Sequence, residues 1–146
     1  MQIKAKHILI IRFSSLGDIA LTVPVISALI RSYPSVKVSV LTKKQFAPLF
    51  HHLSKVEVIS VDFKKQYNGV LGLISLSKKI SSLNVDFIAD FHNVLRTKIL
   101  KLLLRKHNFQ SIDKGRIEKK KLILGQVLQP LKPTVERYSD VIRSFG

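Results

Sequence analysis

The first strongly apolar segment, His7 to Phe13, limits the folds that this chain can adopt. It has the length of a β-strand, and its apolar residues follow one another without alternating with polar ones. An uninterrupted run of this kind is typical of a strand in a parallel sheet, where helices cover both faces. Small and polar residues, Ser14 to Asp18, come directly after it and predict a turn.

Helical periodicity begins after this turn. The apolar positions with helical spacing are Leu21, Val25, Ala28 and Leu29. Pro24 has no backbone donor, so we expect it in the first turn of this helix. The expected N-cap is Asp18 or Thr22, because both side chains can accept a hydrogen bond from a free backbone N–H.

The remainder of the chain alternates between strand and helix patterns. Further strands are expected at residues 36–41, 56–61, 86–91 and 108–112, and helices at 44–53, 71–83, 94–105 and 135–145. The helix at 94–105 is expected to bury Leu95, Ile99, Leu102 and Leu103. Residues 113–121 are expected to form a charged loop, residues 122–128 a helical turn, and Thr134 the N-cap of the last helix. This order predicts an α/β fold, a Rossmann-like open parallel sheet with helices on both faces.

Length and residue usage narrow the class of protein. The chain of 146 residues suits one α/β domain with a substantial core. It has no cysteine, which excludes disulfides and thiolate metal sites, and its five histidines do not have the spacing of a metal site. No secretory signal and no stretch of 18 apolar residues is found, so we expect a cytoplasmic protein without a membrane span.

The charge of the chain is unusual. Lysine and arginine total 25 against 9 acidic residues, a formal net charge of +16. Ten basic residues lie between Arg96 and Lys121, opposed only by Asp113 and Glu118. Such a segment is either a solvated surface or a patch that meets an anionic partner, such as phosphates, nucleic acid or a membrane surface.

Polar clusters follow two of the expected strands. The first is Ser14 to Asp18, and the second is Asp90 to Asn93, with Arg96 one turn into the next helix. Ligands of open α/β sheets bind at the carboxyl ends of strands, so we expect both clusters at one edge. The first cluster lacks the glycines of a dinucleotide or P-loop motif, which disfavours a nucleotide cofactor. At a helix start, Asp18 is expected to be ionised, and it serves either as a helix cap or as a general base.

One long motif in this region is similar to a known family. Residues 8–24 contain a strand, Arg12, an apolar residue, Ser-Ser-Leu-Gly-Asp, an apolar stretch and Thr-Val-Pro. This arrangement closely resembles the N-terminus of the lipopolysaccharide heptosyltransferases of glycosyltransferase family 9. The resemblance continues at residues 86–96 and at Val135-Glu136-Arg137-Tyr138.

The resemblance implies a function and a division into domains. Members of the family are inverting, metal-independent GT-B enzymes with an acceptor-binding N-terminal domain and a C-terminal domain for a nucleotide-sugar, usually ADP-heptose. Residues 1–133 would be the acceptor-side domain, and residues 134–146 the helix leading to the donor domain. The resemblance makes Asp18 the catalytic base that deprotonates the acceptor hydroxyl. The expected acceptor-binding residues are Ser14, Ser15, Gly17, His92, Asn93 and Arg96.

The resemblance also implies partners and a location. Family members are longer than this chain, so we expect it to lack the donor site and to be inactive alone. The expected partners are a lipopolysaccharide precursor, lipid A with its core sugars, and the anionic inner face of the inner membrane. A nucleotide-sugar is expected only in the full-length protein. The alternative is a basic nucleic-acid-binding α/β module, but the chain has no RNP-type motif, no zinc ligands and no clear helix-turn-helix, so no nucleic acid is expected.

Overall fold

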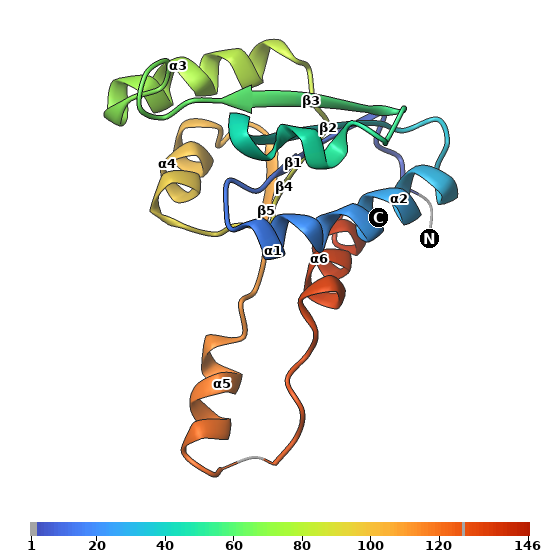
Figure 1. Cartoon of the computed structure of the whole chain (residues 1–146), viewed down its shortest axis with the longest axis vertical. Helices are drawn as coiled ribbons and strands as arrows, with labels where there is room; N and C mark the ends of the chain where they lie inside the picture. The colour runs from blue at the N-terminus through green and yellow to red at the C-terminus, as the bar shows by residue number, and fades with distance from the viewer. Residues whose placement is uncertain (1–2, 127) are drawn as a thin grey trace.

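The computed structural model describes residues 3–126 and 128–146, which form a five-stranded parallel sheet in the order β3-β2-β1-β4-β5. The strands are β1 (His7–Ile11), β2 (Lys37–Lys43), β3 (Val56–Val61), β4 (Phe87–Asp90) and β5 (Asn108–Ser111). The helices are α1 (Leu16–Ala20), α2 (Thr22–Ser32), the 3-10 helix η1 (Lys44–Phe50), α3 (Gly69–Ser82), α4 (Leu95–Leu103), α5 (Arg116–Ile123) and α6 (Thr134–Arg143). The predicted α/β fold with a parallel sheet is confirmed (Figure 1).

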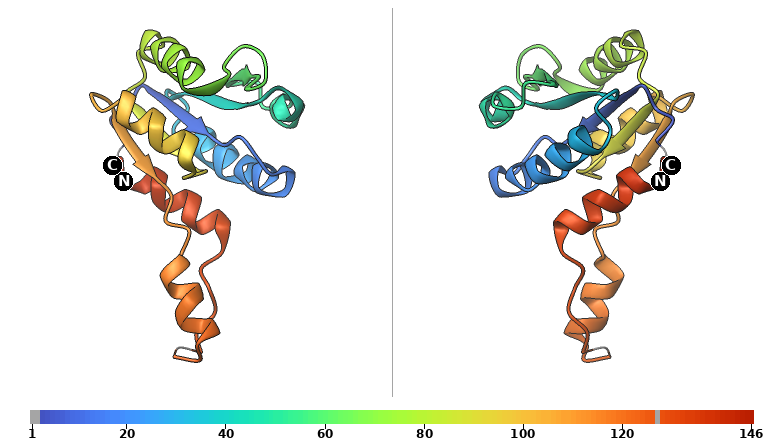
Figure 2. Two further views of the ribbon diagram at one scale, coloured as in Figure 1. Left: turned by 90° about the vertical axis from the view of Figure 1, so that its left-hand side faces the viewer. Right: turned by 90° about the vertical axis from the view of Figure 1, so that its right-hand side faces the viewer.

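The central strand β1 explains why helices cover both faces of the sheet. All five of its residues are buried, as the continuous apolar run predicted. Because successive side chains of a strand point to opposite faces, Ile8 and Ile10 pack into a core with α1, α2 and α6. Leu9 and Ile11 pack into a second core with α3 and α4. The views in Figure 2 show these helices on either side of the sheet.

The predicted first helix is two helices, and neither expected cap is correct. Ser15 is the N-cap of α1 and Leu21 that of α2, and neither makes a side-chain capping bond. Asp18 lies inside α1, and the Thr22 hydroxyl donates to the carbonyl of Ile19 instead. Pro24 is in the first turn of α2, as predicted.

The buried face of α4 differs from the prediction. Of the predicted inward residues, Ile99 packs against the core, but Leu95, Leu102 and Leu103 are exposed. Leu100 and Leu104, the residue after the helix, are buried instead. In a leucine-rich helix two sets of leucines have helical spacing, and the packing of α4 against α3 and the sheet selects one of them. The chosen face includes buried Thr97, whose hydroxyl bonds the backbone of Val94 and so is no obstacle to burial.

Residues 113–126 and 128–133 form an arm that leaves the body of the domain (Figures 1 and 2). The expected charged loop is wrong, because residues 116–123 form α5. The expected helical turn at 122–128 is partly correct: α5 reaches Ile123, Gly125 has a left-handed φ of 69°, and residue 127 lies outside the described residues. The N-cap of α6 is Pro133 rather than Thr134.

Candidate functional site

The two polar clusters meet at the carboxyl edge of the sheet. The chain runs from β1 outward to β2 and β3, and then crosses back to β4 on the other side of β1. Such a reversal of strand order is where open α/β sheets bind their ligands. Arg12 donates through Nη1 to the carbonyl of Phe91 at 2.7 Å, which joins the segment after β1 to the segment after β4. The predicted placement of both clusters at one edge is therefore confirmed.

An ion pair between Arg12 and Asp18 is the centre of this edge. The Arg12 side chain is buried, and its Nη2 lies 2.8 Å from Oδ2 of Asp18. The hydroxyl of Ser15 donates to the same oxygen at 2.9 Å. The backbone N–H of Ser15 also hydrogen-bonds the carboxylate of Asp18. The carboxylate is thus held by Arg12 and Ser15 and is partly exposed, with 41% of its side chain accessible.

The surroundings of Asp18 keep it ionised. Partial burial alone would raise the pKa of its carboxyl group, but the Ser15 hydroxyl and the Arg12 guanidinium outweigh burial, and the net pKa is lowered. At neutral pH the group is a carboxylate that can accept a proton. Arg12 is a residue that sequence reasoning missed as part of the site, although an arginine inside a buried apolar strand run is a signal for a buried partner.

Asp18 lines a cleft of about 430 Å³ between α1, the arm and α6. The other charged residues along it are Arg12, Lys114, Lys119, Lys132 and Arg137. One carboxylate therefore faces a cleft whose remaining ionic groups are all cationic. A ligand with phosphates or carboxylates fits these walls, because lysine and arginine make charge-assisted hydrogen bonds to such groups.

Tyr138 connects α6 to the helix that carries Asp18. Its hydroxyl donates to the backbone carbonyl of Asp18 at 3.1 Å. Its ring is fully buried and stacks on Phe91, with ring centroids 4.4 Å apart. Burial raises the pKa of Tyr138 to about 12, so the phenol stays protonated as a donor. Tyr138 and Asp18 are 120 positions apart, and no local sequence pattern predicts that they are in contact.

The second cluster is a tightly bonded turn. Asp90 is fully buried, and its Oδ1 accepts from the backbone N–H groups of His92 and Asn93, each at 2.9 Å. Asn93 has a left-handed φ of 47°, and its amide donates to the carbonyl of Ile112. The Asn93 side chain lines a separate cleft of about 470 Å³ with Lys98 and Lys114.

His92 lies between this turn and β1. Its Nδ1 accepts a long hydrogen bond of 3.4 Å from the backbone N–H of Phe13, and the two rings are in edge contact. Desolvation, together with the charges of Arg12 and Lys114, lowers the pKa of His92 to about 4. The ring is therefore neutral at physiological pH. It is not among the residues that line the Asp18 cleft.

The remaining predicted site residues are spread more widely. The guanidinium of Arg96 lies 3.9 Å above the ring of Phe63, in another cleft of about 660 Å³ with Lys43, Lys44 and Lys64. Ser15 bonds Asp18, whereas Ser14 does not line the Asp18 cleft. Gly17 lies in α1, does not line the Asp18 cleft, and would have open space around an added Cβ.

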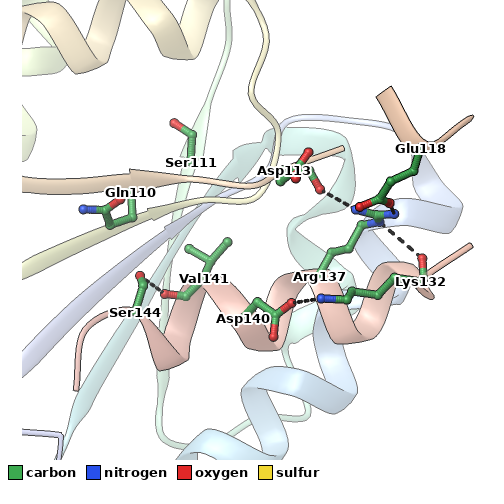
Figure 3. A pocket seen from close by; sticks show the side chains of 9 residues that line it. All are labelled: Gln110, Ser111, Asp113, Glu118, Lys132, Arg137, Asp140, Val141 and Ser144. Atoms are coloured by element: carbon green, nitrogen blue, oxygen red, sulfur yellow. Dashed lines mark hydrogen bonds and ion pairs between the residues drawn. The ribbon is translucent and has the colours of Figure 1, made fainter. Parts of the chain in front are cut away.

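Arg137 fastens the arm to α6, as Figure 3 shows. Its side chain donates to the carbonyls of Asp113 and Lys132 and pairs with Glu118 at 2.7 Å. A Cβ at Gly115, which has a φ of 65°, would collide with this guanidinium. One buried arginine thus holds both ends of the arm, and with them the basic wall of the Asp18 cleft.

Replacing Arg137 by methionine is expected to lower the free energy of unfolding by about 2–3 kcal/mol. The change removes three charge-assisted hydrogen bonds of a buried side chain. The loss is not larger because Glu118 is half-exposed, so water solvates its carboxylate when the arginine is gone. Urea unfolding measures the change, and amide hydrogen exchange should show the arm opening more often. The control is Arg143→Met, an exposed pair with Asp140, expected to cost less than about 0.5 kcal/mol. Equal costs for the two variants would contradict the role of Arg137.

Residues 3–126 and 128–146 contain neither a membrane-spanning helix nor a metal-binding cluster of side chains. No helix there is long and apolar enough to cross a membrane. No group of three or more histidine, cysteine or acidic side chains in that part of the chain is arranged to hold a metal ion.

Solved structures share this fold. The chain matches a glycosyl transferase family 9 protein from Veillonella parvula with a TM-score of 0.73 and 18% identity, over all of this chain and 43% of that one. It matches E. coli heptosyltransferase WaaC, solved with ADP-2-deoxy-2-fluoro heptose, with a TM-score of 0.68 and 19% identity, over 94% of this chain and 47% of that one. It also matches E. coli ADP-heptose lps heptosyltransferase II, with a TM-score of 0.59 and 22% identity, over 92% of this chain and 39% of that one.

These matches concern the fold. The chain spans less than half the length of each of these structures. No family profile and no curated protein matches the chain. The structural class defined by the sheet, its switch point and these neighbours is the Rossmann-like fold found in family 9 glycosyltransferases, as the sequence resemblance predicted.

Proposed function

We propose that this chain is the acceptor-binding half of an inverting glycosyltransferase, which transfers heptose or a related sugar from a nucleotide-sugar to the inner core of lipopolysaccharide. The observation that carries the proposal is the ionised Asp18 in a cationic cleft at the switch point of the sheet. The shared fold with two heptosyltransferases supports the same class of reaction.

In this proposal Asp18 is the general base. An acceptor hydroxyl gives its proton to the carboxylate, and its oxygen attacks the anomeric carbon of the donor sugar. The bond from that carbon to the nucleotide diphosphate breaks, and the bonding electrons leave with the diphosphate. One displacement of this kind inverts the anomeric carbon. Arg12 and Ser15 orient the carboxylate, and the exposed part of its side chain is open to the acceptor hydroxyl.

The lysines of the cleft would bind the anionic groups of the acceptor. Lipid A and its core sugars carry phosphates and carboxylates, which match Lys114, Lys119 and Lys132 in the Asp18 cleft. In the proposal Arg96 binds a further acidic group of a large acceptor, since its cleft contains three lysines as well. The donor, ADP-heptose, is assigned to a second domain that this chain does not include. The net charge of +16 supports a location at the anionic inner face of the inner membrane.

The test compares the 146-residue chain with a two-domain protein that contains it. The chain alone is expected to bind heptose-deficient lipopolysaccharide core in calorimetry, but to transfer no sugar from ADP-heptose. The two-domain protein is expected to transfer heptose with a kcat on the order of 1–10³ s⁻¹. Transfer by the chain alone at such rates, or no acceptor binding by the chain, would contradict the proposal.

A further inference from the structure

We infer that the tip of the arm docks on the surface of an anionic lipid bilayer. The tip consists of Ile123, Leu124 and Leu128, and the arm comprises residues 113–126 and 128–133. This inference refines the proposed membrane location and does not depend on the sugar-transfer reaction. It assigns the contact with lipid to one short element of the fold.

The tip presents aliphatic side chains to solvent. Ile123 is 84%, Leu124 59% and Leu128 91% exposed. None of the eight residues of α5 is buried, so this helix does not pack on the body of the domain. Figures 1 and 2 show the arm projecting away from the sheet. The tip thus exposes three large aliphatic side chains, beside the exposed Gln126 and Gln129, which is unfavourable unless a partner covers them.

A collar of basic residues lies next to this apolar tip. It consists of the exposed Arg116, Lys119, Lys120 and Lys121 of α5. The one acidic residue of the helix, Glu118, pairs with Arg137 at the base of the arm. The clamp at the base and the free tip give the arm a fixed direction away from the sheet.

An anionic bilayer is the partner that accepts both parts of this surface. Aliphatic side chains enter the headgroup and acyl-chain boundary, while neighbouring lysines stay near the lipid phosphates. Nucleic acid would pair with the collar but leave the tip uncovered. A second copy of the chain would bring two equally basic arms together, which like-charge repulsion opposes. The charges and the exposed aliphatic residues together favour lipid.

Vesicle flotation with the 146-residue chain tests the inference. We expect binding to phosphatidylcholine vesicles that contain phosphatidylglycerol to be at least about 10-fold tighter than to pure phosphatidylcholine, and to weaken with salt. The double change Ile123→Ser and Leu124→Ser should reduce this binding about 10-fold. The matched control is Val70→Ser with Leu71→Ser on α3, where both side chains are also exposed, and it should change binding by less than about 2-fold.

Fluorescence gives a second readout, because the chain contains no tryptophan. Emission from Leu128→Trp should shift to shorter wavelength on anionic vesicles, and emission from Leu71→Trp should not. The tip is not the contact if the chain binds anionic vesicles, the double serine variant binds them equally well, and the emission of Leu128→Trp does not shift. If the unmodified chain fails to bind anionic vesicles, both the inference and the proposed membrane location are wrong, while the proposed sugar transfer is untouched. Sedimentation measures whether the chain self-associates. A dimer that is lost in the serine variant, together with no binding to lipid, would identify a second copy as the partner and overturn the inference.

Discussion

Asp18→Asn is expected to reduce the kcat of sugar transfer by about 10²- to 10⁴-fold in a two-domain protein that contains this chain. Asparagine keeps the shape of the side chain, and its amide oxygen can still accept from Ser15 and Arg12. It cannot take a proton from the acceptor hydroxyl. The measurement is steady-state transfer to heptose-deficient core, with calorimetry of acceptor binding to the 146-residue variant, where affinity should change by less than about 3-fold.

The same variant separates a base from a purely structural carboxylate. Because Arg12 is buried, loss of the Asp18 charge leaves its guanidinium without a counter-charge, and the change should cost about 1–3 kcal/mol of unfolding free energy. The lowered pKa of Asp18 predicts that kcat/KM is level at neutral pH and falls only in strong acid. Glu57→Gln is the control, since this carboxylate is in an exposed ion pair with Lys37 and neither residue lines the Asp18 cleft, so transfer should be unchanged. If Asp18→Asn keeps more than about a tenth of kcat, Asp18 is not the catalytic base and its carboxylate has only a structural role.

The parallel sheet could be predicted because the sequence of β1 alone indicates that this strand is buried. Its uninterrupted apolar residues indicate two covered faces, and both faces are covered. The buried face of α4 cannot be predicted from its own sequence, because helical spacing allows either Leu95 or Leu100 to face the core. Packing against α3 and the sheet decides that Leu100 is buried. The helix α5 was missed for the opposite reason. Its charged residues give no periodic apolar face, and no buried face forms.

The site was predictable only where one short segment contains it. The stretch Ser14 to Asp18 carries the carboxylate and the hydroxyl that bonds it. The partners that complete the site come from far along the chain, as the contacts of Asp18 with Tyr138 and of Arg12 with Phe91 show. Arg96 was grouped with Asp18 because it closely follows the same sheet edge, but its side chain lies over Phe63 in a separate cleft. Sequence proximity to an edge thus does not decide which cleft a long side chain enters.

Acidification is expected to weaken the fold through His92. In the folded chain the pKa of His92 is about 4, against 6.5 for an ordinary histidine. Between these values the unfolded chain binds more protons, so the stability that is complete above pH 6.5 falls as the pH drops toward 4. Each pH unit in the window costs up to about 1.4 kcal/mol, and allowing for the partial exposure of the ring we expect a total of about 2–3 kcal/mol. Protonation at Nδ1 would also end the hydrogen bond from Phe13.

The variant His92→Asn isolates this contribution, because its amide oxygen can accept from the Phe13 N–H but does not titrate. Urea unfolding between pH 7 and pH 4 should give a flatter dependence on pH for His92→Asn than for the unmodified chain. Part of the slope should remain, since burial and the charge of Lys37 also lower the pKa of His7. The control His52→Asn changes an exposed histidine and should keep the full slope. Parallel curves for the unmodified chain and His92→Asn would mean that the ring is solvated and that β1 and the turn after β4 do not enclose it.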